Sequence, residues 1–286
     1  MRCSHFSTSE PRGQGLNNIS ERLEFALETA SHAGELALEY FNDFASLTVH
    51  SKGVQDMASE ADLATENLIR GAVEKHFPND AFLGEESAEL FQLPQNDNDY
   101  GTWIVDPIDG TQPFVNGIRS WCIALAYVED HHIRLGVIYD PTANEVFAAR
   151  EGKGATLNGK AIKPADVDGL GDGLIGIGYS NRVTPEAALE PMTRLMHADG
   201  MFHRCGSGAL SLAYVGAGRL IGYYEPHMNS WDFAAGALIV REAGGLTNDC
   251  LPDARTMIVG GPMIAAASGI YDQLVNVVEG KTGIQE

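Results

Sequence analysis

Two aspartates, Asp106 and Asp109, lie at the end of a short apolar segment that begins at Trp103. The segment has the pattern of a buried strand, but Pro107 cannot continue that strand, because proline has a fixed φ and no N–H. The chain must turn here, and we expect both carboxylates to come to the same side of the turn. Buried carboxylates repel each other and lose hydration, and a divalent cation bound between them offsets that cost. The residue types and their spacing therefore indicate a cation site.

Gly110 and Thr111 follow the second aspartate directly. The glycine allows the backbone to come close to a ligand, and the threonine adds a hydroxyl group. Taken alone, the spacing is also typical of a turn with two solvated carboxylates and a threonine cap, because such short patterns are common in proteins. A functional site therefore requires further residues that converge on this turn.

Several other acidic residues lie where predicted strands end or predicted helices begin. They are Glu60, Asp62, Glu85, Glu86, Glu225 and Asp232. In α/β proteins the carboxyl ends of strands and the N-termini of helices line the ligand-binding crevice. Each residue alone is typical of a helix cap or a solvated surface, but their shared placement favours one site. Because the ligands are all oxygen atoms, the expected ion is a hard cation, Mg²⁺ before Mn²⁺ or Ca²⁺.

Two glycine-containing segments offer backbone N–H groups to an anion. Gly206-Ser207-Gly208 precedes a predicted helix, and Gly110-Thr111 is expected to open a helical turn. The N–H groups at the start of a helix have no partner within the helix, and they bind anions readily. Divalent cations beside such N–H groups indicate a phosphate group as the ligand.

The acidic composition limits the classes of partner. The 286-residue chain has 39 Asp and Glu against 19 Lys and Arg, which gives a formal net charge of −20. Such a chain lacks the basic surface that binds a nucleic-acid polymer, and it repels anionic lipid. No apolar segment approaches the ~20 residues that a membrane-spanning helix needs. A small anion must therefore be bound by metal ions and N–H groups rather than by a cluster of Lys and Arg.

The four cysteines favour a reducing compartment. They are Cys3, Cys122, Cys205 and Cys250, and no two of them are close in the sequence. Cys122 lies in an apolar strand pattern, where a buried thiol is expected. Residues 1–17 are polar without an apolar centre, so we expect a disordered tail rather than a signal peptide. These features together predict a cytoplasmic protein.

The hydrophobic periodicity predicts an α/β protein with mixed sheets, in which helices and strands position these residues. The first amphipathic helix is expected over residues 20–41, and a second begins near residue 60 and ends before Pro78. A strand over residues 81–87 follows, and it carries Glu85 towards its end. A polar loop then leads to the central strand.

The rest of the chain changes pattern twice. Residues 118–162 predict consecutive antiparallel strands, with a hairpin turn at Asn158-Gly159. Residues 164–173 are rich in Gly and Asp, and we interpret them as a hinge between two halves. Beyond the hinge, strands are expected at 174–179, 202–205, 221–225 and within 257–267, and helices at 185–198, 209–220, 230–243 and 271–278.

Three motifs in this chain resemble those of the inositol monophosphatase superfamily of metal-dependent phosphatases. Gly84–Ser87 is similar to the family's G-E-E-S motif, and Trp103–Thr111 is similar to W-I-x-D-P-I-D-G-T. Trp231–Gly236 and Glu242–Gly245 are similar to W-D-x-A-A-G and E-A-G-G. The order and spacing agree as well, and the resemblance covers roughly residues 20–280. Three motifs in the family's order are far more specific than a bare D-x-x-D pair.

The resemblance implies a fold and a domain organisation. The fold would be a layered αβαβα sandwich of the inositol monophosphatase and fructose-1,6-bisphosphatase type. A single phosphatase domain would span residues 18–280. Its N-terminal half, residues 18–163, would contain the antiparallel sheet and most metal ligands. Its C-terminal half, residues 164–280, would contribute the substrate-side residues.

The resemblance also implies a role for each matching residue. Two or three Mg²⁺ ions, with Mn²⁺ as a substitute, would be held by Glu85, Asp106, the Ile108 carbonyl, Asp109 and Asp232. Thr111 would orient the attacking water, Glu85 would also accept a proton, and Asp109 would belong to the catalytic group. The substrate and its phosphate would contact Gly110, Thr111, Gly206, Ser207, Gly208 and Glu225, and Lys52 and Asp62 would form a supporting pair near the metals.

The activity implied by the resemblance is that of a Mg²⁺-dependent phosphatase similar to inositol-1-monophosphatase. It would hydrolyse a small polyol or sugar-like phosphate monoester by metal-activated water, without a phosphoenzyme, because no Ser–His or Cys–His pair accompanies the motifs. One departure concerns the rim of the site, where Gln112-Pro113 replaces the Thr-Asn that often follows the D-G-T. A homodimer is also implied, with the apolar hairpin region as a candidate interface.

Other functions stay open on the sequence alone. Within the superfamily they are histidinol-phosphate phosphatase, fructose-1,6-bisphosphatase and 3′-phosphoadenosine-5′-phosphate phosphatase. Glu225, seven residues before Asp232, favours a polyol monophosphate. A catalytically inactive regulator that binds metal or phosphate is the alternative from another class, although the intact acids and Thr111 favour an enzyme.

Overall fold

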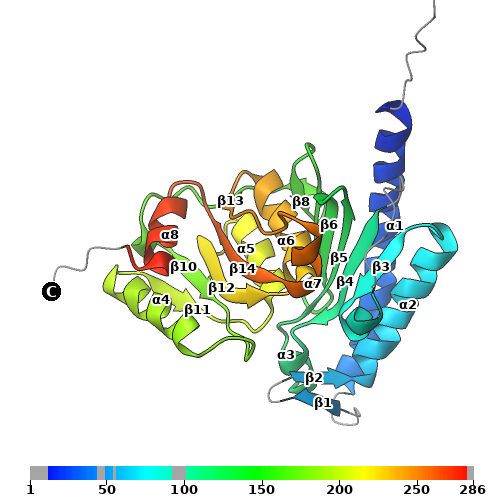
Figure 1. The fold of residues 1–286 in the computed structure, drawn as a ribbon, viewed down its shortest axis with the longest axis horizontal. Helices are drawn as coiled ribbons and strands as arrows, with labels where there is room; N and C mark the ends of the chain where they lie inside the picture. Colours follow the sequence, from blue (N-terminus) through cyan, green and yellow to red (C-terminus); the bar gives the residue numbers. More distant parts are fainter. Residues whose placement is uncertain (1–11, 44–48, 54–55, 92–100, 282–286) are drawn as a thin grey trace, which may run out of the picture.

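Two β-sheets and three layers of helices are stacked alternately (Figure 1). The computed structural model describes residues 12–43, 49–53, 56–91 and 101–281. In order, the layers are α1 (Arg12–Asn42) and α2 (Glu60–His76), a seven-stranded sheet, α5 (Gly208–Gly216) and α6 (Ser230–Ala243), a five-stranded sheet, and α4 (Glu186–His197) and α8 (Tyr271–Glu279). This order confirms the predicted αβαβα sandwich.

The seven-stranded sheet is antiparallel except at one edge. Its strands, in spatial order, are β3 (Ala81–Gly84), β4 (Thr102–Asp109), β5 (Cys122–Glu129), β6 (His132–Asp140), β7 (Glu145–Arg150), β8 (Ala155–Leu157) and β9 (Lys160–Ala161). Only the β3–β4 pair is parallel. The predicted hairpin turn is confirmed, since Asn158 and Gly159 have the positive φ values of 48° and 73° that a type I′ turn requires.

The five-stranded sheet is mixed. Its strands, in spatial order, are β11 (Met201–His203), β10 (Leu174–Ile177), β12 (Gly222–Met228), β14 (Gly261–Ala266) and β13 (Leu246–Thr247). Strand β10 pairs in parallel with both β11 and β12, so all three of these strands end at the same edge of the sheet. That edge faces the end of β4, and the functional site forms there.

Two elements differ from the prediction in the C-terminal half. Within 257–267, where strands are expected, β14 covers residues 261–266, but residues 257–259 belong to a helix, α7 (Ala254–Val259). The Asp253 side chain caps this helix by accepting a hydrogen bond of 2.8 Å from the Thr256 N–H, a local contact that apolar periodicity does not reveal. Strand β13 was not predicted, because two residues are too few to show alternation.

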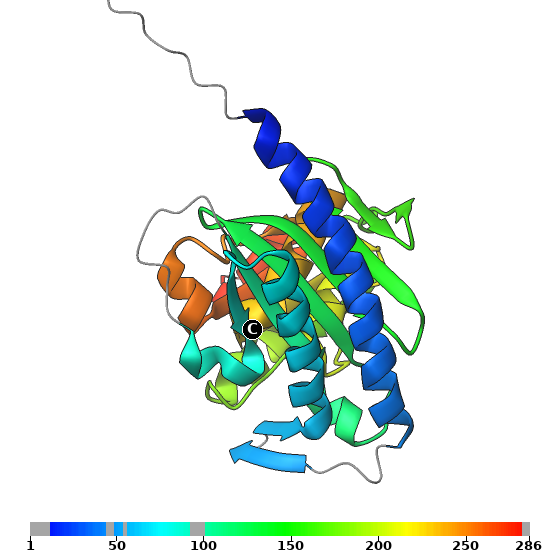
Figure 2. The same ribbon diagram turned by 90° about the vertical axis from the view of Figure 1, so that its right-hand side faces the viewer.

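The N-terminal region also differs from the prediction. Helix α1 begins at Arg12, so residues 12–17, which were expected in the tail, are helical, and residues 1–11 lie outside the described part. A helix that has formed extends at little cost per residue, which accounts for the added turns. Strand β1 (Val49–Gly53) pairs with an unpredicted strand, β2 (Asp56–Ser59), directly before α2. Figure 2 shows α1 and α2 side by side across the outer face of the large sheet.

Apolar clusters fill the spaces between the layers and hold the central strands rigidly. The cluster under α1 and α2 includes Trp103, Phe114 and Trp121, and the cluster between the sheets includes Phe147 and Phe233. All eight residues of β4 are buried. Each large apolar side chain that is fully buried contributes about 1.5–3 kcal/mol to stability. The strand that carries the two aspartates therefore has a fixed position.

No described helix is both long and apolar enough to cross a membrane.

Candidate active site

A β-bulge at the end of β4 brings its two aspartates to one side. In a regular strand, residues three apart point to opposite faces of the sheet. Here Asp106 pairs with Ala124 and Asp109 pairs with Cys122, so β4 contains one residue more than β5 over this stretch. The extra residue reverses the alternation and turns Asp109 to the same side as Asp106. The expected turn at Pro107 is thus a bulge within the strand, because pairing with β5 resumes at Asp109.

Hydrogen bonds fix both carboxylates. The Ile108 N–H donates to Asp106 Oδ1 over 3.0 Å. Asp109 Oδ2 accepts from the Ser207 hydroxyl at 2.5 Å and from the Ala209 N–H at 2.6 Å. These last two donors belong to the start of α5, which lies between the sheets. The second aspartate is therefore attached to both halves of the chain.

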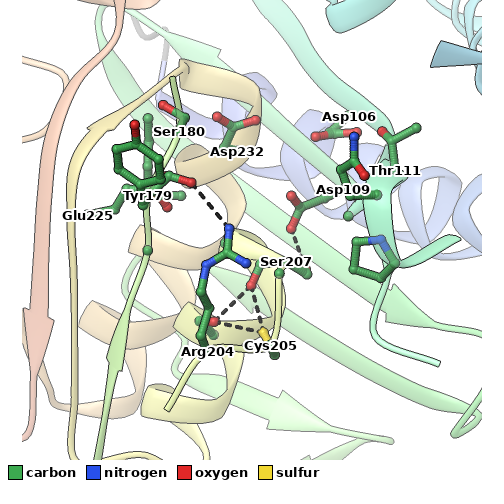
Figure 3. A pocket seen from close by; sticks show the side chains of 18 of the residues that line it. Asp106, Asp109, Thr111, Tyr179, Ser180, Arg204, Cys205, Ser207, Glu225 and Asp232 are labelled. Carbon is green, nitrogen blue, oxygen red and sulfur yellow. Dashed lines mark hydrogen bonds between the residues drawn. The ribbon is translucent and has the colours of Figure 1, made fainter. Parts of the chain in front are cut away.

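A third aspartate completes a compact cluster. Asp232 lies in the first turn of α6, and its Oδ2 accepts a hydrogen bond of 2.9 Å from the Asn229 N–H. One carboxylate oxygen from each of Asp106, Asp109 and Asp232 lies within 4.8 Å of the other two (Figure 3). Three converging carboxylates from separate elements form a donor set of hard oxygens, which fits Mg²⁺ or a similar cation.

The electrostatics of this cluster also call for a cation. Burial raises the pKa of Asp106 well above its ordinary value, and the charges of Glu85 and of the other two aspartates raise it further. Burial likewise raises the pKa of Asp109, and that of Asp232 to about 8. A raised pKa means that the charged form of these groups is disfavoured unless an opposite charge lies nearby. A bound divalent cation supplies that charge and allows all three to ionise.

Glu85 lies close to the cluster but in a different kind of element from the one predicted. Strand β3 ends at Gly84, and Glu85 is the first residue of a 3₁₀-helix, Glu85–Leu90. The side chain is half-buried and lines the same cleft as the three aspartates. Its charge acts directly on Asp106, so it can join the ion-binding group.

Thr111 is held by a buried acid behind the cluster. Its hydroxyl points towards Asp62 Oδ1 and the Ile108 carbonyl, with both oxygens 3.3 Å away. Asp62 is fully buried in α2 and does not line the cleft. As expected, Thr111 opens a short helix, α3 (Thr111–Val115), and Gly110 before it has a φ of 100°. A Cβ at Gly110 would lie 2.7 Å from the Ser120 carbonyl, so only glycine fits there. Lys52 lies in β1, and its side chain is outside the described part of the chain.

The residues that are expected to contact the substrate line the same cleft and come from the second half of the chain. Ser207 caps α5 by accepting a hydrogen bond from the Leu210 N–H over 3.1 Å. Gly206 has a φ of 91°, and a Cβ there would lie 2.8 Å from Pro113 Cγ. Glu225, near the end of β12, accepts a hydrogen bond of 2.5 Å from the Tyr223 hydroxyl. Burial raises the pKa of Glu225 to about 7.

One cleft of about 790 Å³ collects these groups. Of the predicted site residues it is lined by Glu85, Asp106, Ile108, Asp109, Gly110, Thr111, Gly206, Ser207, Gly208, Glu225 and Asp232. Sequence reasoning missed Gly178, Arg182 and Arg204, which also line it. Each of these lies directly after, or within a few residues of, the carboxyl end of β10 or β11. The same rule that selected the acids would have selected them.

Comparisons with known proteins agree with this geometry. The model of the inositol monophosphatase family matches residues 18–282. Inositol monophosphatase 1 of Solanum lycopersicum is 38% identical over 243 residues, which cover 81% of this chain and 85% of that protein. Nus factor SuhB of Escherichia coli K12 is 32% identical over 240 residues, which cover 83% and 88%. The crystal structure of the extragenic suppressor protein SuhB from Bartonella henselae superposes with a TM-score of 0.82 at 31% identity, covering 92% of this chain and 100% of that one. With the motifs, the fold and these relatives in agreement, the chain belongs to the inositol monophosphatase family.

Proposed function

We propose that the protein is a Mg²⁺-dependent phosphatase that hydrolyses a small polyol or sugar-like phosphate monoester, as inositol monophosphatases do. The observation that carries this proposal is the cluster of three aspartates from β4 and α6, beside a threonine hydroxyl that is held in place by a buried acid. Membership of a phosphatase family agrees with it.

Five groups would hold the ions, namely the carboxylates of Glu85, Asp106, Asp109 and Asp232 and the Ile108 carbonyl. We propose two or three Mg²⁺ ions, with Mn²⁺ as a substitute. When bound, the ions neutralise the phosphate oxygens and make a water acidic enough to attack near neutral pH. Ser207 and the start of α5 keep Asp109 oriented for this task, because both donate to Asp109 Oδ2.

Thr111 would orient the attacking water. A hydroxyl has a single proton, and Thr111 directs it towards Asp62 and the Ile108 carbonyl. The Thr111 oxygen can then only accept a further hydrogen bond. A water that donates to this oxygen would be oriented with one of its own lone pairs towards the phosphorus. Glu85 would accept a proton from this water. This proposal needs no phosphoenzyme, and the described residues of the cleft include no histidine to activate a serine or cysteine.

Glu225 and backbone N–H groups would bind the substrate. The N–H groups of Gly110 and Thr111 would contact the phosphate, and the Glu225 carboxylate would accept a hydrogen bond from a hydroxyl of the alcohol. Gly206, Ser207 and Gly208 would form the wall beside that alcohol. Because Pro113 packs against Gly206, the rim at Gln112-Pro113 is the part of the site where specificity would depart from that for inositol phosphate.

The test is phosphate release over a panel of monoesters with and without Mg²⁺. The panel contains inositol 1-phosphate, glycerol 2-phosphate, histidinol phosphate, fructose 1,6-bisphosphate and 3′-phosphoadenosine 5′-phosphate, which cover the alternatives within the superfamily. We expect Mg²⁺-dependent release to be fastest with a polyol or sugar phosphate. Release that is absent from every compound would instead favour a catalytically inactive regulator that binds metal or phosphate.

We also propose that the protein is a cytoplasmic homodimer. The three described cysteines are free thiols, as expected in a reducing compartment. The hairpin at Asn158-Gly159 stays a candidate interface, since β9 is exposed and β8 is mostly half-buried. Exposed apolar side chains also lie at the β10–β11 edge and on α4, namely Leu174, Leu189, Met196, Met201 and Phe202. Light scattering after size exclusion would give the mass, and a monomer would contradict this part of the proposal.

A further inference from the structure

Two arginines stand out in the cleft. Among the described residues that line it, Arg182 and Arg204 are the only Lys or Arg, facing five carboxylates. The whole chain has a net charge of −20 and only 19 Lys and Arg. Basic side chains are therefore scarce, and their placement here needs an explanation beyond surface solubility.

Both arginines follow adjacent strands and are exposed to the cleft. Arg182 lies in the loop after β10 and Arg204 directly after β11, and these two strands are paired in parallel. Arg204 Nη2 donates a hydrogen bond of 3.4 Å to the Tyr179 carbonyl. Figure 3 shows Arg204 and Tyr179 on the opposite side of the view from Asp106 and Thr111. Arg204 thus belongs to the wall away from Asp106 and Thr111, and Arg182 follows the strand paired with β11.

The arginines act on Glu225 without forming an ion pair with it. All three residues line the same cleft, and the charges of Arg204 and Arg182 both lower the pKa of Glu225, which burial raises. No salt bridge joins either arginine to an acid within the described residues. Glu225 receives its hydrogen bond from Tyr223 instead. The N–H groups of the two arginines are therefore not hydrogen-bonded to Glu225.

The chemistry of the groups in the cleft suggests what those donors bind. The aspartate cluster would take the ester phosphate, Glu225 would take a hydroxyl, and the two arginines line the same cleft, with Arg204 on the other side of the view from Asp106 and Thr111 (Figure 3). A guanidinium group matches the geometry of a phosphate or carboxylate, to which it can donate two parallel hydrogen bonds. A bare polyol monophosphate would bring no second anion to these guanidinium groups.

We propose that Arg182 and Arg204 form a subsite for a second anionic group of the substrate, separate from the phosphate that is hydrolysed. This inference rests on the proposed phosphatase function and narrows its substrate class. The preferred substrate is then a hydroxylated phosphate monoester whose alcohol part carries a further phosphate or carboxylate, separated from the hydrolysed ester by hydroxyl-bearing carbons.

Three linear hexitol derivatives test this directly, because they differ only at C1. Sorbitol 6-phosphate has a hydroxyl there, 6-phosphogluconate has a carboxylate, and sorbitol 1,6-bisphosphate has a phosphate. For the wild-type enzyme with Mg²⁺, we expect kcat/KM to be about tenfold or more higher for at least one of the two charged compounds than for sorbitol 6-phosphate, as charge-assisted hydrogen bonds imply. If 6-phosphogluconate reacts faster, the subsite prefers a carboxylate, and if sorbitol 1,6-bisphosphate reacts faster, it prefers a phosphate.

The variants Arg182→Gln and Arg204→Gln should lower that ratio towards one. The ratio is the useful readout, because any general effect on folding or on the metal centre changes both rate constants equally. Arg119→Gln is the matched control, since Arg119 is exposed, lies next to the cleft residue Ile118 and does not line the cleft itself. This control should leave the ratio within about twofold of wild type.

The outcomes separate failure of this inference from failure of the proposed function. Equal kcat/KM values for all three compounds, or an unchanged ratio in both arginine variants, would overturn the second subsite while the phosphatase assignment stood. Absence of Mg²⁺-dependent release from all three and from the wider panel would overturn both. A ratio that falls in the arginine variants and also falls with added salt supports the inference.

Discussion

At the scale of single residues, the hydroxyl proton of Thr111 is the smallest feature on which the proposed chemistry depends. It points at Asp62 Oδ1 and the Ile108 carbonyl, each 3.3 Å from Thr111 Oγ1. Thr111→Val should reduce kcat by about 100-fold, because the attacking water loses its orientation while the metal ligands stay in place. Steady-state kinetics and Mg²⁺ titration measure the two effects separately.

The control for this change is Thr111→Ser, which keeps the hydroxyl and should retain most of the wild-type kcat. If the valine variant turned over substrate as fast as the serine variant, the hydroxyl would have no role in orienting water.

Asp106 is a fully buried member of the cluster, beside several other acids. Burial and the neighbouring acids raise its pKa well above the ordinary value. Asp106→Asn should therefore lower kcat/KM by more than about 100-fold, through loss of an ion ligand. The same variant should unfold at a higher temperature than wild type in EDTA, because a buried ionisable group is removed. Assays with Mg²⁺ and calorimetry in EDTA test both parts.

A variant that kept most of the wild-type turnover would show that the cluster is not the catalytic ion site. A variant that lost activity and also unfolded in EDTA would assign Asp106 a structural role only.

At the scale of elements, the end of β10 comes so close to β12 that no side chain fits between them. A Cβ at Gly178 would lie 2.1 Å from Glu225 Oε2. Gly178→Ala should displace the Glu225 carboxylate and raise KM by about tenfold, the effect of one lost hydrogen bond to an ionised group. Mg²⁺ affinity should not change, because the aspartate cluster lies on other elements. Kinetics and metal titration check these expectations.

Gly71→Ala is the control for that substitution. Gly71 lies within α2 and has no atom within 4 Å of an added Cβ. Alanine there should stabilise the protein by about 0.5–1 kcal/mol, since glycine is a poor helix former. A similar rise in KM in this variant would mean that the effect at Gly178 is not local.

The helices and strands also show how much of the fold could be predicted from the sequence alone. Strong periodic signals and turn residues located β4 to β8, α2, α4, α6 and α8, because burial imposes regular spacing on long elements. The bulge in β4, the start of α1 and the identity of α7 were missed. Each depends on pairing, on helix extension or on one capping hydrogen bond, which leave little trace in apolar spacing. The arginines were missed because only acids were sought at the strand ends.

At the scale of the whole molecule, the acidic cluster links stability to pH. Burial and mutual repulsion raise the pKa of Asp106 and Asp109, and that of Asp232 to about 8. A carboxyl with a higher pKa in the folded state keeps protons that the unfolded chain releases above its own pKa of about 4. Between these two pKa values the folded state binds more protons, so stability falls as the pH rises.

The melting temperature in EDTA should therefore decrease between about pH 5 and pH 8, and saturating Mg²⁺ should remove much of this decrease. Calorimetry across that range provides the measurement, and Asp106→Asn should show a smaller decrease than wild type. Equal slopes with and without the ion would contradict the link between the cluster and metal binding.

The three aspartates are contributed by segments on either side of residues 164–173, with Asp106 and Asp109 before it and Asp232 after it. An ion that binds all three therefore links the segments before and after residues 164–173. Its affinity is high only when these two segments are associated. Cleaving the chain within that connector should then leave the fragments associated in the presence of Mg²⁺ and let them separate once a chelator withdraws it.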